Sequence, residues 1–185
     1  MLVIIMGALA FVCFFVYDLN SVIWKNRMLH QSFTTGIIFV VLSTSLALFK
    51  GTSSIQWNQV STFLGVFSAL ISLTALIYTL FFALPFKETY GTMKETNDLC
   101  TDGVYALCRH PGFWPFAGFY LSLCIIVPTQ TIFVLTFILV GLNFLYILFQ
   151  DQWTFRKTFV DYDRYTDSTP FLMPTFSSIN QCIHT

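Results

Sequence analysis

Five apolar runs of near-membrane length constrain this chain more than any other feature. A helix that crosses a bilayer needs about 20 mostly apolar residues, because each residue advances about 1.5 Å through a core of about 30 Å. Only 10% of the residues are charged, and a water-soluble fold of this size has no interior large enough for so much apolar surface. The sequence therefore predicts an all-α integral membrane bundle of five transmembrane helices. Their ranges are Met1 to Tyr17, Phe33 to Phe49, Thr62 to Phe86, Phe113 to Val127 and Thr131 to Gln150.

The lysines and arginines are distributed unevenly between the two sides of this predicted bundle. Of the nine basic residues, only Lys50 lies on the side opposite to the others. Because short loops rich in Lys and Arg remain in the cytosol, we expect the N-terminus outside and the C-terminus in the cytosol. The first residues lack a basic stretch, so we interpret them as a membrane span and not as a signal peptide. The formal net charge of zero argues against a nucleic-acid partner.

Polar residues gather in two pieces of the chain, 87–112 and 151–185, and both are predicted to lie on the cytosolic side. A site built from both pieces is the simplest interpretation. We therefore divide the chain into a three-span scaffold (1–86), a catalytic half (87–174) and a frayed tail (175–185). The catalytic half would hold a polar loop, a helical hairpin and a C-terminal helix. The five cysteines form no Cys-x-x-Cys pair, so neither a disulfide framework nor a metal site is expected.

The triplet Arg109-His110-Pro111 stands just before the fourth predicted span and is the first candidate for chemistry. Pro111 favours an extended His110 and suits the first turn of a helix, where unpaired backbone N–H groups offer a polar surface. From this position at a helix entrance, alanine at residue 109 or 110 is expected to remove function at little cost in packing. The alternative interpretation is structural: an arginine that reaches for lipid headgroups and a proline that breaks a helix.

The fifth predicted span carries polar side chains on one face. Asn143, Tyr146 and Gln150 are spaced at helical intervals, and Asp151 follows at the end of the span. Polar groups within a membrane are costly and usually face the interior of a bundle or a wet cavity, although Asn and Gln also link helices by hydrogen bonds. A tight hairpin at residues 128–130 is expected to place the fourth and fifth spans side by side.

Aromatic residues recur in the tail that follows the fifth span. Phe155, Phe159 and Tyr162 lie near helical spacing, which predicts an amphipathic helix that continues the span or lies on the membrane. The alternative is that these aromatic side chains only anchor the chain at the membrane interface. Pro170 and Pro174 are expected to end this helix.

These motifs follow one another in a recognisable order. Gly103 and Tyr105 precede Arg109-His110-Pro111, and an apolar hairpin and an acidic residue follow, then Phe-x-x-Tyr-x-x-Tyr and a final Pro-Phe-Leu-Met-Pro. Over about residues 99–174, this order resembles the isoprenylcysteine carboxyl methyltransferase family, whose wider group includes the phospholipid methyltransferases. The resemblance implies an integral membrane methyltransferase that uses S-adenosyl-L-methionine.

The resemblance also implies which residues form the site. In that family the Arg-His-Pro loop, the last two spans and the C-terminal helix form a cytosolic pocket for S-adenosylmethionine, and an apolar substrate group enters from the bilayer. Arg109, His110 and Asp151 are the implied catalytic residues. The implied acceptor is a membrane lipid or an apolar-tailed molecule, such as an isoprenylcysteine carboxylate, a phospholipid amine or a small thiol. The implied cofactor-binding residues are Tyr105, His110, Pro111, Gln150, Asp151 and Tyr162.

Methyl transfer from a sulfonium would give these residues distinct tasks. Donor and acceptor must be aligned and water excluded. A carboxylate acceptor needs no base, whereas an amine or thiol must lose a proton, for which His110 and Asp151 are the candidates. The sulfonium favours acidic or aromatic neighbours such as Asp151, Trp153 and Tyr162, and Arg109 can hold an anionic acceptor.

The sequence departs from the family pattern at three points. Residues 150–152 read Gln-Asp-Gln in place of a Glu-Glu pair, the Phe-Gly-x-x-Tyr element is one residue shorter at 159–162, and Phe113 replaces a Tyr. Two alternative functions therefore stay open. One is an NADPH-dependent membrane reductase for sterol-like lipids, although such enzymes tend to have Asn-Tyr where this chain has Gly112-Phe113. The other is a non-catalytic membrane carrier of the same fold.

Overall fold

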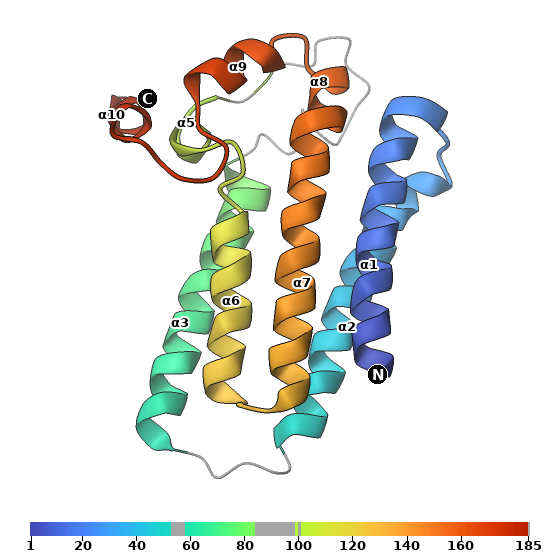
Figure 1. The fold of residues 1–185 in the computed structure, drawn as a ribbon, viewed down its shortest axis with the longest axis vertical. Coiled ribbons are helices and arrows are strands. Elements are labelled where there is room, and N and C mark those ends of the chain that lie inside the picture. Colours follow the sequence, from blue (N-terminus) through green and yellow to red (C-terminus); the bar gives the residue numbers. More distant parts are fainter. Residues whose placement is uncertain (53–57, 84–98, 100, 185) are drawn as a thin grey trace.

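The computed structural model describes residues 1–52, 58–83, 99 and 101–184, and within these ranges all regular structure is helical (Figure 1). Five long helices run side by side and form the bundle. They are α1 (Leu2–Leu19), α2 (Ser32–Thr52), α3 (Gln59–Ile77), α6 (Phe113–Ile126) and α7 (Gln130–Phe149).

The remaining elements are short, and most gather at one end of the bundle, at the top of Figure 1. We call this the polar end, and it carries α5, α8, α9 and α10. The short elements are η1 (Asn20–Trp24), η2 (Leu29–Gln31), η3 (Tyr78–Phe82), α5 (Val104–Leu107), η4 (Gln150–Thr154), α8 (Phe155–Thr158), α9 (Tyr162–Ser168) and α10 (Phe176–His184). Of these, η1, η3 and η4 are π-helical turns that extend α1, α3 and α7.

Four helical segments are long and apolar enough to cross a membrane: Leu2–Trp24, Leu29–Gly51, Gln59–Phe82 and Gln130–Thr158. The all-α prediction is therefore confirmed, and four of the five predicted spans correspond to such segments. The remaining one, the fourth predicted span, corresponds to α6, which is apolar but has only 14 residues, about 21 Å at 1.5 Å per residue. The predicted end of the third span and the domain boundary at 86/87 lie outside the described residues.

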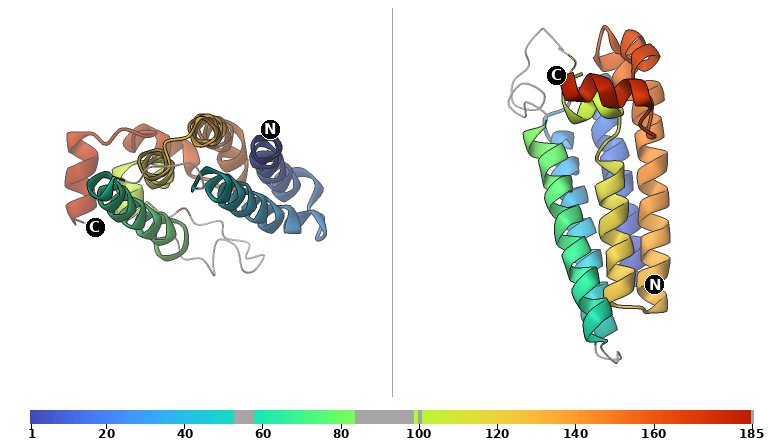
Figure 2. Two further views of the ribbon diagram at one scale, coloured as in Figure 1. Left: turned by 90° about the horizontal axis from the view of Figure 1, so that it is seen from below. Right: turned by 90° about the vertical axis from the view of Figure 1, so that its left-hand side faces the viewer.

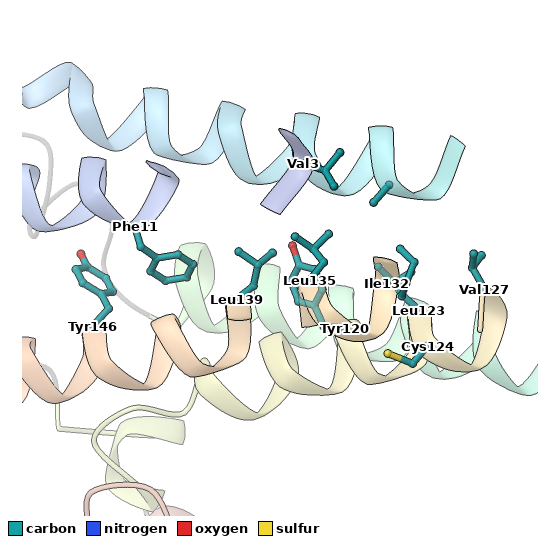
Figure 3. Close-up of a cluster of buried hydrophobic side chains, with 11 residues drawn as sticks. Val3, Phe11, Tyr120, Leu123, Cys124, Val127, Ile132, Leu135, Leu139 and Tyr146 are labelled. Carbon is teal, nitrogen blue, oxygen red and sulfur yellow. The ribbon is translucent and has the colours of Figure 1, made fainter. Parts of the chain in front are cut away.

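Contacts around α7 hold the bundle together. This helix packs against α1, α2 and α6, and α6 packs in turn against α3 (Figures 1 and 2). Figure 3 shows the buried core between them, where Phe11 of α1 and Tyr120 of α6 belong to the same cluster as Leu139 and Tyr146 of α7. Within this apolar core, the hydroxyl groups of Tyr120 and Thr44 hydrogen-bond at 2.8 Å and so link α6 to α2.

The connection between α6 and α7 is as tight as the sequence predicts. The first helix ends at Ile126 and the second begins at Gln130, so the predicted hairpin at 128–130 is confirmed. Thr129 caps α7, since its side-chain oxygen accepts a hydrogen bond from Ile132 N at 3.4 Å. The hairpin brings the polar ends of both helices together.

Small residues let two pairs of helices approach closely. Between α3 and α6, the Ser122 hydroxyl donates to that of Ser68 at 2.9 Å. Between α1 and α2, a Cβ atom on Gly36 would stand 2.5 Å from the Phe14 ring and 2.9 Å from the carbonyl oxygen of Ala10. Inside lipid, where helices gain little from hydrophobic burial, such close backbone approach is a main source of association.

The predicted single helix through Phe155, Phe159 and Tyr162 is wrong. The helix stops at Thr158, Phe159 is extended, and a separate helix, α9, begins at Tyr162. A continuous helix would carry Tyr162 about 16 Å along the axis from Asp151. In the structure the chain folds back, and the Tyr162 hydroxyl lies 2.6 Å from the Asp151 carboxylate.

The predicted frayed tail is also wrong, because residues 176–184 form α10. Two residues explain why the helix begins where it does. The Thr175 side chain accepts a hydrogen bond from Ser178 N at 3.2 Å, and the Ser178 side chain accepts one from Thr175 N at 2.9 Å. This reciprocal pair is the arrangement of a capping box.

We expect Gly36→Ala to lower the free energy of unfolding by about 1–3 kcal/mol, the typical cost of overpacking. The added methyl group would meet the Ala10 carbonyl, which cannot turn aside. The matched control is Gly141→Ala in α7, where a Cβ atom meets nothing within 4 Å and alanine favours the helix. Thermal unfolding in detergent measures both variants, and equal melting temperatures would contradict the close approach of α1 and α2.

Candidate functional site

Asp151 of η4 is buried at the polar end of the bundle, and four hydrogen bonds converge on its carboxylate. Two come from Arg109, from Nε to Oδ1 at 2.8 Å and from Nη2 to Oδ2 at 3.0 Å. The Tyr162 hydroxyl donates to Oδ1 at 2.6 Å, and His110 Nε2 lies 3.3 Å from the same oxygen. Donors placed in this way favour the ionised carboxylate. We call Arg109, His110, Asp151 and Tyr162 the Asp151 cluster.

The guanidinium of Arg109 joins this cluster to the tail. Besides its two bonds to Asp151, its Nη1 donates to the carbonyl oxygens of Thr166 at 3.1 Å and Thr169 at 2.7 Å, at the end of α9. Burial alone would lower the pKa of Arg109, but the hydrogen bonds and negative charge of Asp151 outweigh it and raise the pKa. The four bonds use four of the five N–H groups of the side chain.

His110 is enclosed by aromatic rings. Its imidazole stacks on Phe155 at 5.7 Å and meets the edge of Phe171 at 5.1 Å, between ring centroids. Burial lowers its pKa in spite of the neighbouring Asp151 carboxylate, so the imidazole is neutral at pH 7. Because ionised Asp151 can only accept, Nε2 carries the proton, and Nδ1 is left as the basic nitrogen.

Tyr162 acts as a fixed donor in the cluster. Burial and the hydrogen bond to the Asp151 carboxylate raise the pKa of its hydroxyl well above the ordinary range for tyrosine. The phenol therefore stays protonated at pH 7 and donates to Oδ1. Its ring also packs at an angle against Phe155, 5.5 Å away between centroids, and so helps to enclose His110.

Backbone pairing explains why the Arg109-His110 segment meets the tail. Arg109 N donates to Pro170 O at 2.9 Å, and His110 N donates to Phe171 O at 3.3 Å. Pro111 has no N–H to pair, and the chain turns there and enters α6 two residues later. Because Gly112 is the N-cap, Pro111 lies before the helix and not, as the sequence predicted, in its first turn. The sequence order Arg-His-Pro thus supplies two paired residues and then a turn.

Tyr105 contacts the elements that surround the cluster, and Pro111 directly follows His110. The Tyr105 hydroxyl donates to the carbonyl oxygen of Thr79 in η3 at 3.0 Å. The backbone carbonyl oxygen of Tyr105 accepts a hydrogen bond from the Tyr165 hydroxyl at 2.6 Å. Tyr105 therefore ties α5 to the third long helix on one side and to α9 on the other.

A second polar cluster lies on the opposite side of η4; it includes Tyr146 and Gln150, which the sequence indicated, and Asp18, which it did not. Asp18 of α1 is buried and hydrogen-bonds Tyr146, Gln150 and Thr154, with the Thr154 hydroxyl 3.4 Å from Asp18 Oδ2. Gln150 Nε2 also donates to the Tyr146 hydroxyl at 2.9 Å. We call these four residues the Asp18 cluster. The available signal was a carboxylate directly after an apolar run, but the predicted first span ended at Tyr17.

The structure thus divides the residues selected from the sequence. It brings Arg109, His110, Asp151 and Tyr162 into one hydrogen-bonded group, whereas Gln150 turns towards Asp18. Trp153 stacks on Phe149, and the Lys157 ammonium lies 4.5 Å from the centre of its ring. The expectation that alanine at 109 or 110 costs little packing is wrong, because the His110 side chain is buried and that of Arg109 is only 11% exposed and makes four hydrogen bonds.

Within the described ranges, no group of three His, Cys, Asp or Glu side chains lies close enough to hold a metal ion.

Comparisons with known proteins returned no match to this chain, whether with protein-family models, curated proteins or solved structures. The resemblance to the methyltransferase family therefore rests on the motif residues themselves.

We expect Asp151→Asn to destabilise the fold by about 3–5 kcal/mol, the cost of leaving a buried charge without its partner. The side chains of Arg109 and Asp151 are only 11% and 8% exposed. The matched control is Asp163→Asn, which breaks a 3.0 Å pair with Arg156 whose side chains are 78% and 47% exposed. That change should cost about 1 kcal/mol or less. Thermal unfolding of both variants in detergent provides the measurement, and similar losses would contradict the central role of Asp151.

Proposed function

We propose that this protein is an integral membrane methyltransferase that uses S-adenosyl-L-methionine and acts on an acceptor with an apolar tail. The observation that carries the proposal is the Asp151 cluster. Its members come from three separate segments, which are the three segments that the family resemblance selects. A bundle that needed only packing would have little reason to gather an arginine, a histidine, an aspartate and a tyrosine at one buried point.

The residues around the cluster suit S-adenosylmethionine in part. Aromatic rings attract a sulfonium cation; Phe155 and Phe171 lie against His110, and Tyr162 packs on Phe155. The remaining N–H of Arg109 can bind the carboxylate of the methionine portion. Asp151 already accepts hydrogen bonds from Arg109, His110 and Tyr162, so its main contribution is to hold Arg109 and His110 in place. The chemistry that the cofactor supplies when bound is a methyl group on a positively charged sulfur.

His110 and Arg109 then have separate tasks. Neutral His110, with its proton on Nε2 towards Asp151, offers Nδ1 to take a proton from an amine or thiol acceptor. Arg109 provides positive charge for an anionic acceptor group such as a carboxylate or phosphate. The aromatic rings exclude water from the same place, which strengthens each of these interactions.

An apolar depression on α7 supports an acceptor with a hydrocarbon tail. It is an open surface lined by Phe137, Ile138, Gly141, Leu142, Phe144 and Leu145. At the upper edge of this surface, the Phe144 ring contacts Phe113 and Phe171, and the Arg109 guanidinium lies 5.7 Å from the centre of the Phe171 ring. A tail on this surface would therefore lead towards the Asp151 cluster.

Binding and turnover provide the direct test of the proposed function. Purified protein in detergent should bind S-adenosylmethionine and its demethylated product in calorimetry, and should not bind NADPH. His110→Gln should lower methyl transfer to an amine or thiol by about 10²–10⁴-fold, the usual contribution of a general base. Transfer to a carboxylate acceptor, which needs no base, should change little, and donor affinity should stay the same.

Two results would replace this proposal with one of its alternatives. Binding of NADPH without binding of S-adenosylmethionine would favour the membrane reductase. Binding of neither by protein that melts normally would favour a non-catalytic carrier. Asp163→Asn changes an exposed side chain that does not belong to the Asp151 cluster, so it serves as the control for nonspecific loss of activity.

We also propose that α6 completes a five-span topology, with the N-terminus outside and the polar end in the cytosol. The placement of eight of the nine basic residues, all but Lys50, supports it. In a cysteine-free background, Lys50→Cys should react with an impermeant thiol reagent in intact cells. Asn180→Cys should react only after the cells are permeabilised. Labelling of residue 180 in intact cells would overturn the topology.

A further inference from the structure

In α10 a polar side chain is buried and large apolar side chains are exposed, which is the reverse of a helix packed on the surface of a soluble protein. Ser178, a small polar residue, is completely buried against the protein. Phe176, Ile179 and Ile183 are 95%, 41% and 72% exposed. Their spacing of three and four residues places them on one face of the helix. The largest apolar groups of α10 therefore face away from the protein.

The direction of α10 fits a surface that lies across the bundle. In the right-hand view of Figure 2 the helix runs at right angles to the long helices, at the polar end of the bundle. It packs on α5, and Tyr105 of α5 is bonded to the carbonyl of Thr79 in η3. This chain of contacts fixes α10 close to the end of the third long helix.

Two aromatic features mark this level of the molecule as the edge of the apolar zone. Phe81 and Phe82 of η3 are 46% and 74% exposed and continue the lipid-type surface of α3. Trp114, in the first turn of α6, is partly exposed and donates its indole N–H to the carbonyl oxygen of Leu172 at 2.9 Å. Tryptophan with an apolar ring and a satisfied N–H is typical of the membrane interface. Leu172 lies only a few residues before α10.

We propose that α10 is an interfacial helix that lies on the protein's own membrane, with Phe176, Ile179 and Ile183 inserted at the level of the headgroups. A helix with an apolar face, parallel to the bilayer and at its edge, has the geometry of such anchors. A second copy of the chain fits less well, because a stable protein interface buries about 800 Å² on each partner. Three side chains on a helix of nine residues provide far less.

The anchor would act on the segment that pairs with the Arg109-His110 motif. Pro170 O and Phe171 O accept hydrogen bonds from Arg109 N and His110 N, and the same segment leads directly into α10. Membrane contact of α10 would therefore hold this segment at a fixed depth. The inference does not depend on the proposed methyltransferase function, since it concerns only where the tail lies.

Site-directed spin labelling of the full chain tests this proposal. Genetically encoded ketone residues allow a nitroxide to be attached while all native cysteines remain. Labels at 176, 179 and 183 are compared with control labels at Ser177 and Gln181. These two residues are also exposed but lie on another face of α10 than Phe176, Ile179 and Ile183. The protein is reconstituted in nanodiscs of mixed neutral and anionic phospholipids.

The accessibility of each label to two relaxation agents decides the outcome. We expect oxygen, which concentrates in lipid, to relax the labels at 176, 179 and 183 several-fold more than water-soluble nickel chelate does. The reverse is expected at Ser177 and Gln181. If nickel chelate reaches all five positions equally, the helix lies in water and the proposal is overturned. Spin–spin broadening at 176 or 179 would overturn it in favour of a second copy of the chain.

Discussion

The ion pair between Arg109 and Asp151 is the interaction on which the polar end depends. A carboxylate with so little exposure is costly unless donors replace the lost water, and here donors come from the loop before α6 and from α9. The same guanidinium binds two carbonyl oxygens at the end of α9. One charge pair thus fixes the loop, the tail and the end of α7 relative to one another.

The π-helical turn η4 explains how two polar clusters share one stretch of chain. An extra residue in the turn widens it, so Gln150 and Thr154 face Asp18 of α1 while Asp151 faces Arg109. The Asp151 cluster and the Asp18 cluster are therefore joined through the backbone of a single turn. Such widened turns often occur at functional sites because they direct a side chain away from the regular helical spacing.

Hydropathy and motif order predict what depends on local sequence, and contacts between distant residues decide the rest. Apolar runs predicted the long helices, and the Arg-His-Pro motif drew attention to residues that the structure brings together. The break at Phe159 was missed because helical periodicity in the tail carries no information about the hydrogen bond between Tyr162 and Asp151. Asp18 was missed because its partners are more than 100 residues away. The start of α10 was missed because residues 175–178 read Thr-Phe-Ser-Ser, without the Glu or Gln that marks a capping box in a sequence.

The four hydrogen bonds to Asp151 shape what a ligand would meet at this site. Three donors share Oδ1 and one binds Oδ2, so a ligand would meet a network that already has its geometry. The groups open to it would include the last N–H of Arg109, the second nitrogen of His110 and the aromatic rings around them. Preorganised groups of this kind need no rearrangement as charge develops on a reacting molecule. The stability of the polar end and the chemistry proposed for it would therefore draw on the same buried charge pair.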